Sequence, residues 1–457
     1  MACNMTQTLW FETALLPEGW ARRVRLTVGD GRIAAIVRDT QPSAEDDRHP
    51  IAIPGLANVH SHAFQRGMAG LAERRGPTGD DFWTWREVMY RFLDRLTPDD
   101  VQAIAALAYL EMLERGFTRV GEFHYLHHDR SGEAYSAPAA MAQAVAAAAD
   151  ETGIGLTLLP VFYAHGNFGG AQPVSGQRRF LNDVDAFANL FEGCKRAISH
   201  LPDANIGVAP HSLRAVTPGE LAKIVPLVHG GPVHIHAAEQ VKEVEDCVAW
   251  SGARPIEWLL DNASLDERWT LIHATHMTEN EASRLARTGA VAGICPVTEA
   301  NLGDGVFRAR EFLSSGGRFG VGTDSNVQID AAYELRSLEY AQRLLHRGRN
   351  LWTSIPNAST GRALFDGALA GGAQSLGNSA CGIRLGAGAD FVTLDVEDPT
   401  LEGRSDDAIL DSWIFAGARI DCVWRHGQKL VSCGRHRART LVQDRYRAAV
   451  RRLLLDN

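Results

Sequence analysis

The sequence predicts an α/β fold in which a (β/α)8 TIM-like barrel carries a small β-sandwich built from both ends of the chain. Short apolar runs alternate with helical stretches through the middle of the chain, as such a barrel requires. Short runs of alternating apolar and polar residues, separated by turn signals, occupy both ends. The chain has 457 residues, of which 45% are hydrophobic and 22% charged, so it can bury the core of a large barrel and of an accessory module.

The β-sandwich is predicted from two distant segments. Near the N-terminus, residues 24–28 and 33–37 flank a turn signal at 29–31 and predict a small antiparallel unit. A similar pattern returns at 390–395, after a glycine-rich turn, and at 421–427. The expected division is a β-sandwich of residues 1–53 and 375–435, a catalytic barrel of 54–374, and a C-terminal segment of 436–457 with an amphipathic helix at 439–455.

Eight apolar runs are expected to form the barrel strands. In chain order they end at His62, His124, Val161, His211, His236, His273, Cys295 and Asp324. Helical stretches separate most of them, at 100–114, 137–150, 184–197, 218–228, 240–250 and 279–288. The alternative is a doubly wound open sheet. That fold would carry a glycine-rich phosphate-binding turn after its first strand, which this sequence lacks.

Residues typical of metal ligands stand at three of these strand ends. His60 and His62 share one side of the first strand, because side chains alternate along a strand. His236 ends the fifth strand and Asp324 the eighth. Taken singly, the histidines could be surface or core residues and Asp324 a helix cap. Together at the C-terminal ends of barrel strands, they predict a site for one zinc-class metal with room for water. Iron, manganese or cobalt could also occupy such a site.

This order of residues resembles the mononuclear deaminase branch of the amidohydrolase superfamily. That branch carries His-x-His on strand one, His-x-x-Glu on strand five, His on strand six and Asp on strand eight. No lysine ends strand four, where dinuclear members carry a carboxylated one. Within the superfamily the chain is most similar to the formimidoylglutamate deiminases, over the runs 58–66, 82–86, 121–125, 209–214 and 295–305. The resemblance covers the whole chain, because a split β-sandwich is also a feature of the superfamily.

The resemblance implies hydrolysis of N-formimidoyl-L-glutamate to N-formyl-L-glutamate and ammonia in histidine degradation, with one divalent metal ion per chain, zinc by preference. The metal ligands that it implies are His60, His62, His236 and Asp324. The catalytic residues that it implies are Glu239, His273 and Asp324. The implied substrate-binding residues are Gln65, Arg86, Tyr125, His211 and Arg214.

Elementary chemistry supports these roles. A metal lowers the pKa of a bound water. Glu239, three residues past His236, can then move a proton from that water to the departing amine. The substrate carries two carboxylates, which Arg86 and Arg214 can bind. Arg86 could instead pack on a neighbouring tryptophan at the surface, and Gln65 and Tyr125 could simply pack in their loops. For His124, His127 and His128 we expect a structural role in their loop, with a second metal as the alternative.

Bulk properties limit the possible partners. The net charge of −9 argues against nucleic acid or an anionic membrane as the main partner. The seven cysteines are scattered without a Cys-x-x-Cys pair, and no targeting or membrane segment is evident. We therefore expect a cytoplasmic enzyme with a small-molecule substrate, and a homodimer because relatives are commonly dimers.

Two other functions stay open. A deaminase of a purine, pyrimidine or triazine ring would share every metal residue, although its pocket would favour aromatic and amide contacts over arginines. A catalytically silent barrel acting as a scaffold would usually have lost metal ligands, whereas this chain keeps all of them.

Overall fold

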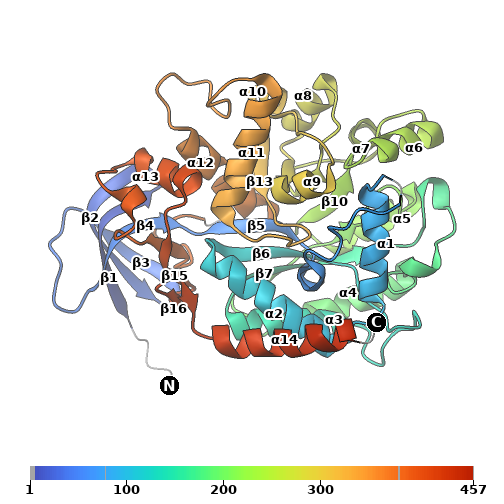
Figure 1. Ribbon diagram of the computed structural model, residues 1–457, viewed down its shortest axis with the longest axis horizontal. Coiled ribbons are helices and arrows are strands. Elements are labelled where there is room, and N and C mark those ends of the chain that lie inside the picture. Colours follow the sequence, from blue (N-terminus) through green and yellow to red (C-terminus); the bar gives the residue numbers. More distant parts are fainter. Residues whose placement is uncertain (1–5, 78, 379–380, 456–457) are drawn as a thin grey trace.

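The computed structural model of the protein describes residues 6–77, 79–378 and 381–455. The predicted segments 1–53, 375–435 and 436–457 therefore extend, at residues 1–5, 379–380 and 456–457, outside the described residues. In Figure 1 the strands β1 to β4 form one lobe and the barrel with its helices forms the other. Among the described residues, no helix combines the length and apolar character needed to cross a membrane.

The predicted barrel is confirmed. Parallel strands pair in the order β10-β11-β12-β13-β5-β6-β7-β8, and β9 also pairs with β7. Backbone bridges from Val208 to Val233 and from Ser212 to His236 join strand four to β10 and close the barrel. The strands are β5 (Leu56–Ser61), β6 (Phe117–His124), β7 (Gly155–Phe162), β8 (Asn205–Ile206), β9 (Ala209–Pro210), β10 (Val233–Ala237), β11 (Trp269–His273), β12 (Val291–Ile294) and β13 (Arg318–Val321). The fourth barrel strand is thus split into two short pieces.

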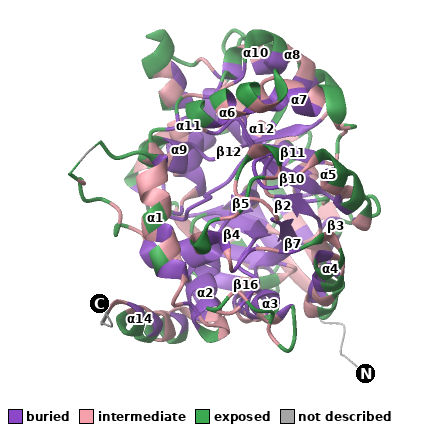
Figure 2. Cartoon of the chain, turned by 90° about the vertical axis from the view of Figure 1, so that its right-hand side faces the viewer, coloured by how far each residue is buried: buried purple, intermediate pink, exposed green. Residues whose placement is uncertain are grey.

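Helices surround the barrel and cover its strands, which are buried in Figure 2. Those at the predicted positions are α2 (Pro98–Glu114), α3 (Ala140–Thr152), α4 (Val184–Ile198), α5 (Pro218–Ile224), α6 (Val241–Ser251) and α8 (Glu279–Thr288). Capping boxes at Thr97 and Thr278 start α2 and α8. Helices without a counterpart among the predicted ones are α1 (Phe82–Leu93), α7 (Pro255–Asn262), α9 (Pro296–Leu302), α10 (Ala309–Ser314), α11 (Ala331–His346), α12 (Thr360–Ser375) and α13 (Asp407–Asp411).

Both ends of the chain build a separate β unit, as predicted, but its strands form one mixed sheet. The order is β17-β16-β15-β14-β4-β1-β2-β3. Its strands are β1 (Gln7–Leu16), β2 (Gly19–Gly29), β3 (Arg32–Val37), β4 (Asp47–Pro54), β14 (Phe391–Leu394), β15 (Ile420–Arg425), β16 (Gln428–Ser432) and β17 (Arg435–His436). β2 and β3 pair in antiparallel fashion around the predicted turn, as expected, and β1 pairs antiparallel with β2, but β1 pairs with β4 in parallel. The sheet encloses a core of its own, which includes Phe11, Leu26, Phe391 and Trp424.

Buried and half-buried ion pairs join the β unit to the barrel. Arg425 on β15 forms ion pairs with Asp203 and with Asp390, and Asp203 also pairs with Arg119 on β6 at 2.7 Å. The two arginine side chains are only 3% and 5% exposed, so their charges depend on these carboxylates.

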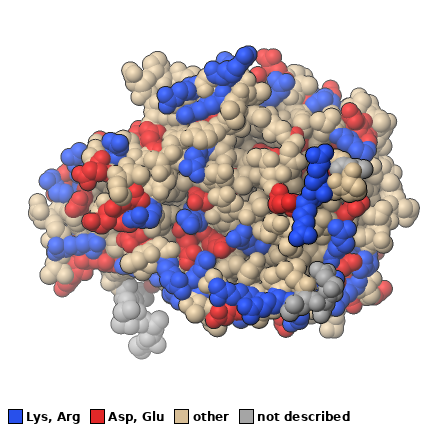
Figure 3. All heavy atoms as spheres, viewed as in Figure 1, with Lys and Arg blue, Asp and Glu red and all other residues tan. Residues whose placement is uncertain are grey.

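Helix α14 (Arg439–Leu455) lies beneath α2 and α3 in Figure 1. Its Arg439 pairs with Glu114 at 2.7 Å, and Arg445 pairs with Glu151. In the space-filling view of Figure 3 a row of Lys and Arg side chains follows this lower edge, while both signs of charge are mixed over the rest of the face. The arginines of α14 therefore attach the C-terminal segment to the acidic ends of two barrel helices.

Candidate metal centre and active-site pocket

The predicted metal-ligand residues meet because β5 and β13 are neighbouring strands of the barrel. His60 and His62 project from β5 at alternate positions, and Asp324 follows β13. The amide of Asp324 donates to the carbonyl of His60, and the amide of His62 donates to the carbonyl of Asp324, each at 2.9 Å. Asp324 is thereby held beside the His-x-His pair in a left-handed conformation (φ +45°), which is uncommon for a residue other than glycine.

The four predicted ligand side chains converge. The Nε2 atom of His60 lies 3.1 Å from Nε2 of His62 and 3.1 Å from Nε2 of His236. Asp324 Oδ1 lies 3.4 Å from Nε2 of His60 and 3.2 Å from Nε2 of His62. Donor atoms at about 2.0–2.2 Å from a tetrahedral metal are about 3.3–3.6 Å apart. The separations of 3.1–3.4 Å differ from this range by at most a few tenths of an ångström, so small side-chain shifts would let the set bind one such ion. All four residues are buried, and their donor atoms lie within 4.8 Å of one another.

Main-chain carbonyls orient two of the imidazoles. Nδ1 of His62 donates to the carbonyl of Phe123 at 3.0 Å, and Nδ1 of His236 donates to the carbonyl of His211 at 3.1 Å. Each bond leaves the Nε2 lone pair free for a metal.

The protonation states also suit metal binding, which needs neutral imidazoles and an ionised carboxylate. Burial and the neighbouring His62 lower the pKa of His60 to about 3. Burial opposes ionisation of Asp324, but hydrogen bonds with His60 and His62 hold its pKa well below the usual value.

A second group of side chains lies beside the ligands. Nε2 of His273 is 3.7 Å from Oε1 of Glu239 and 3.9 Å from Oδ2 of Asp324. Burial raises the pKa of Glu239. Burial also disfavours a charged His273, but the carboxylates around the ring outweigh this effect and raise its pKa to about 10. The surrounding carboxylates therefore favour the protonated form of the His273 ring, which faces the predicted metal site.

Glu299 is a partner of His273 that the sequence analysis missed. Its Oε1 accepts a bond from Nδ1 of His273 at 3.2 Å and another from the amide of Cys295 at 2.9 Å. Glu299 lies on α9, directly after β12, within the run 295–305 that carries part of the family resemblance. The sequence signal that could have indicated Glu299 is an acidic residue in the first turn of the helix that follows a barrel strand.

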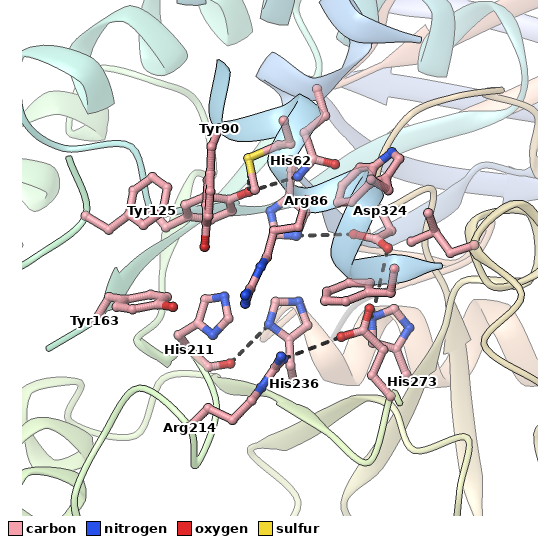
Figure 4. A pocket seen from close by; sticks show the side chains of 17 residues that line it. His62, Arg86, Tyr90, Tyr125, Tyr163, His211, Arg214, His236, His273 and Asp324 are labelled. Carbon is pink, nitrogen blue, oxygen red and sulfur yellow. Dashed lines mark hydrogen bonds and ion pairs between the residues drawn. The ribbon is translucent and has the colours of Figure 1, made fainter. Parts of the chain in front are cut away.

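A pocket of about 560 Å³ opens above these groups. All five predicted substrate-binding residues line it, namely Gln65, Arg86, Tyr125, His211 and Arg214. The rest of the pocket wall, which local sequence patterns did not predict, is apolar and aromatic and comprises Phe82, Trp85, Met89, Tyr90, Tyr163, Phe180 and Leu302. Figure 4 shows the ends of Arg86 and Arg214 pointing into the space beside His211 and His236.

The two arginines have different surroundings. Arg86 stacks on Trp83, with Cζ 4.5 Å from the ring centroid, and it also lines the pocket. The two positions that were considered as alternatives for this side chain are therefore occupied at the same time. Arg214 is buried, and its Nη2 lies 3.6 Å from Oε2 of Glu239. Arg214 therefore contacts the residue predicted to move the proton, and Arg86 does not share that contact.

The histidine cluster after β6 is part of the loop structure. Nε2 of His127 donates to the carbonyl of Val161 at 2.8 Å, and Nε2 of His128 donates to the carbonyl of Leu181 at 2.7 Å. Within the described ranges, neither these two residues nor His124 belongs to a group of side chains that could hold a metal.

Comparison with known proteins places this geometry in a family. The profile of the amidohydrolase family matches residues 51–430, and that of the N-terminal domain of the formimidoylglutamate deiminase HutF matches residues 6–50. The chain belongs to the amidohydrolase family. Its sequence is 48% identical over 432 residues to a formimidoylglutamate deiminase of Pseudomonas aeruginosa, covering 94% of this chain and 95% of that protein. This amidohydrolase is thus a relative of formimidoylglutamate deiminases along almost its whole length.

Other relatives share the scaffold. A 5-methylthioadenosine/S-adenosylhomocysteine deaminase of Natronomonas pharaonis is 30% identical, over 78% of this chain and 75% of that protein. The crystal structure of an amidohydrolase from Brucella melitensis superposes with a TM-score of 0.96 at 54% identity, covering 98% of this chain and 100% of that one. A zinc-bound adenosine deaminase from Xanthomonas campestris superposes with a TM-score of 0.82 at 20% identity, covering 98% of both chains, and so shares the amidohydrolase fold.

Proposed function

We infer that this amidohydrolase is a formimidoylglutamate deiminase, which hydrolyses N-formimidoyl-L-glutamate to N-formyl-L-glutamate and ammonia in histidine degradation. The observation that carries this inference is a pocket with a metal-ligand set on its floor and two arginines, Arg86 and Arg214, at its side. Two guanidinium groups match a substrate with two carboxylates. The 48% identical deiminase of Pseudomonas aeruginosa supports the same substrate.

The residues on the pocket floor suit a hydrolytic mechanism. A divalent cation held by His60, His62, His236 and Asp324 would supply a water whose pKa is lowered toward neutrality. We propose zinc, because the donor set is three imidazoles and one carboxylate and because a structural relative carries zinc.

The remaining groups would move protons and stabilise charge. Asp324 accepts a proton from the attacking water. Glu239 carries a proton to the nitrogen that leaves as ammonia when the carbon–nitrogen bond breaks. The imidazolium of His273 donates a hydrogen bond to the oxygen that adds to the formimidoyl carbon. Gln65, Tyr125 and His211 line the same pocket, so we assign them to binding of the glutamate portion.

We also propose that the enzyme works in the cytoplasm and as a homodimer. Free cysteines at six positions, from Cys194 to Cys433, are typical of a reducing compartment, and Cys3 lies outside the described residues. The exposed apolar side chains of Leu344 and Leu345 on α11 support self-association, which sedimentation would measure.

A ring deaminase is the second candidate. It is favoured by the aromatic wall of Tyr90, Tyr163 and Phe180 and by the 30% identity to the 5-methylthioadenosine/S-adenosylhomocysteine deaminase of Natronomonas pharaonis. The decisive experiment is ammonia release by metal-loaded protein from N-formimidoyl-L-glutamate and, in parallel, from 5-methylthioadenosine and adenosine. His236→Ala serves as the inactive control. Turnover of a ring substrate at a higher kcat/KM than N-formimidoyl-L-glutamate would overturn the proposed function.

A further inference from the structure

Arg179 is a buried cation that lies behind the pocket wall. It belongs to the loop after β7 and is 0% exposed. Its Nη2 donates to the carbonyl of Leu96 at 2.9 Å, its Nη1 donates to the carbonyl of Leu93, and its Nε donates to the carbonyl of His128 at 3.0 Å. Each guanidinium nitrogen thus donates to a main-chain carbonyl of a different part of the chain from Arg179, namely the end of α1, the turn after it and the loop after β6.

One of these carbonyls is the last of α1, and another lies in the turn that follows α1. The last carbonyls of a helix lack partners within it, and a cation there interacts favourably with the helix dipole. Leu93 is the last residue of α1, and Leu96 follows in the next turn. Because a buried guanidinium is costly unless its donors are satisfied, this geometry fixes the end of α1 at one position relative to Arg179.

The main chain of Arg179 makes the connection to the loop after β6. The amides of His127 and His128 both donate to the carbonyl of Arg179, at 3.1 and 3.0 Å. The same loop begins with Tyr125, which lines the pocket. Arg179 therefore joins the loops that follow three consecutive barrel strands, β5, β6 and β7.

Each of these loops supplies part of the substrate pocket. The α1 helix supplies Arg86 and Tyr90, and the loop after β6 supplies Tyr125. Phe180, the neighbour of Arg179, packs its ring 4.9 Å from that of Tyr125 and 6.2 Å from that of Tyr90. Loss of the Arg179 hydrogen bonds would therefore displace the end of α1 and, with this helix, the guanidinium of Arg86.

We propose that Arg179 is a positioning residue that sets the selectivity of this enzyme for a carboxylate-bearing substrate, by holding α1 so that Arg86 faces the pocket. The inference rests on the proposed function, since it concerns the substrate-binding half of the same site. Arg179 acts through Arg86 and leaves the metal centre unaffected. A misplacement of about 1 Å can cost roughly a hundredfold in rate, so one displaced helix is enough to change substrate preference.

The test uses Arg179→Met and Arg179→Lys in the full-length, metal-loaded enzyme. For N-formimidoyl-L-glutamate we expect kcat/KM to fall roughly ten- to a hundredfold in the Met variant, mainly through KM. For a formimidoyl compound without carboxylates, turnover stays within about twofold of wild type. The Lys variant keeps the positive charge but loses the planar set of N–H donors that binds three carbonyls at once, so its KM lies between those of wild type and the Met variant. Arg425→Met, which removes a buried arginine from the interface with the β unit, is the matched control and keeps the wild-type KM.

A double-mutant cycle with Arg86→Met shows whether Arg179 acts through Arg86. Loss of Arg179 should have little further effect on kcat/KM once Arg86 is gone. Three outcomes would each overturn the proposal. They are fully additive effects of the two substitutions on kcat/KM, a wild-type KM in Arg179→Lys, and equal losses of kcat/KM on substrates with and without carboxylates. If Arg179→Met does not fold, the Lys variant alone carries the test.

Hydrogen exchange separates this proposal from the proposed function. Amides of α1 should exchange faster in both Arg179 variants than in wild type and in Arg425→Met, whatever substrate the enzyme uses. Unchanged exchange in α1 would refute the positioning role. Wild-type protein that releases no ammonia from N-formimidoyl-L-glutamate would refute the proposed function instead.

Discussion

Replacing Arg86 and Arg214 separately by Met should distinguish two arginines that the sequence alone treats as equivalent. Both line the pocket, but Arg214 also lies 3.6 Å from Glu239, whereas Arg86 stacks on Trp83. A hydrogen bond to a charged group contributes about 1.5–3 kcal/mol. At about 1.4 kcal/mol per factor of ten, each variant should lose roughly 10- to 150-fold in kcat/KM on N-formimidoyl-L-glutamate.

Only the Arg214 variant should also change the pH profile. The Arg214 guanidinium opposes the upward effect of burial on the pKa of Glu239. Its loss therefore raises the pKa of Glu239. Because Glu239 must be ionised before it can take up the proton that it carries to the leaving nitrogen, the acid limb of kcat/KM moves to higher pH. In Arg86→Met the limb should stay in place.

The assay is steady-state ammonia release from pH 5 to 10 at constant ionic strength, with metal content measured for each variant. A formimidoyl compound without carboxylates is the control substrate, for which neither loss should exceed about threefold. Identical pH profiles for the two variants would refute the link between Arg214 and Glu239. Equal losses on both substrates would refute the carboxylate-binding role of the arginines.

Four further outcomes follow from the described contacts. His236→Ala should lose bound metal and activity together, as elemental analysis and turnover would show. Glu239→Gln should keep its metal and lose roughly 10²–10⁴-fold in kcat, the usual contribution of general acid–base catalysis; near-normal turnover would place the proton transfer elsewhere. Glu299→Gln should lower the pKa of His273 from about 10, so the alkaline limb of kcat moves to lower pH in a rate profile, and an unmoved limb would contradict the pairing. Arg425→Met removes the ion pairs with Asp203, which keeps its pair with Arg119, and with the half-buried Asp390, and should cost about 1.5–3 kcal/mol of unfolding free energy, measured by denaturant titration; a change below about 0.5 kcal/mol would show that the interface does not need it.

The sequence was most informative where each functional residue belongs to a strand-end motif. His60 and His62 lie two residues apart at the end of β5, and Asp324 follows the neighbouring strand β13, so strand geometry and barrel topology together bring them near each other. The barrel itself follows from alternation of apolar strands and helices. None of these features depends on the detailed path of a loop.

Features that depend on contacts between distant loops could not be derived from local pattern. Glu299 faces His273 only because α9 begins beside β11, and Phe180 enters the pocket only through the loop that Arg179 anchors. Helix α11 shows what the sequence analysis passed over, because its buried Leu335 and Leu338 follow helical spacing. The parallel pairing of β1 with β4 likewise has no signal in either strand.

The pairing of β4 with β14 has a consequence for how the chain folds during synthesis. Phe391 on β14 pairs with Pro54 on β4. The ribosome must therefore synthesise the whole barrel after β4 before the partner strand β14 exists. Protein synthesis adds about 5–20 residues per second, so one edge of β4 stays unpaired for on the order of tens of seconds before β14 is made. An uncovered strand edge can pair with another chain, so the nascent protein is most prone to aggregate during that interval. Completion of this sheet, which both ends of the chain build, is therefore a late event, and low temperature or chaperone supply during expression should raise the yield of folded protein.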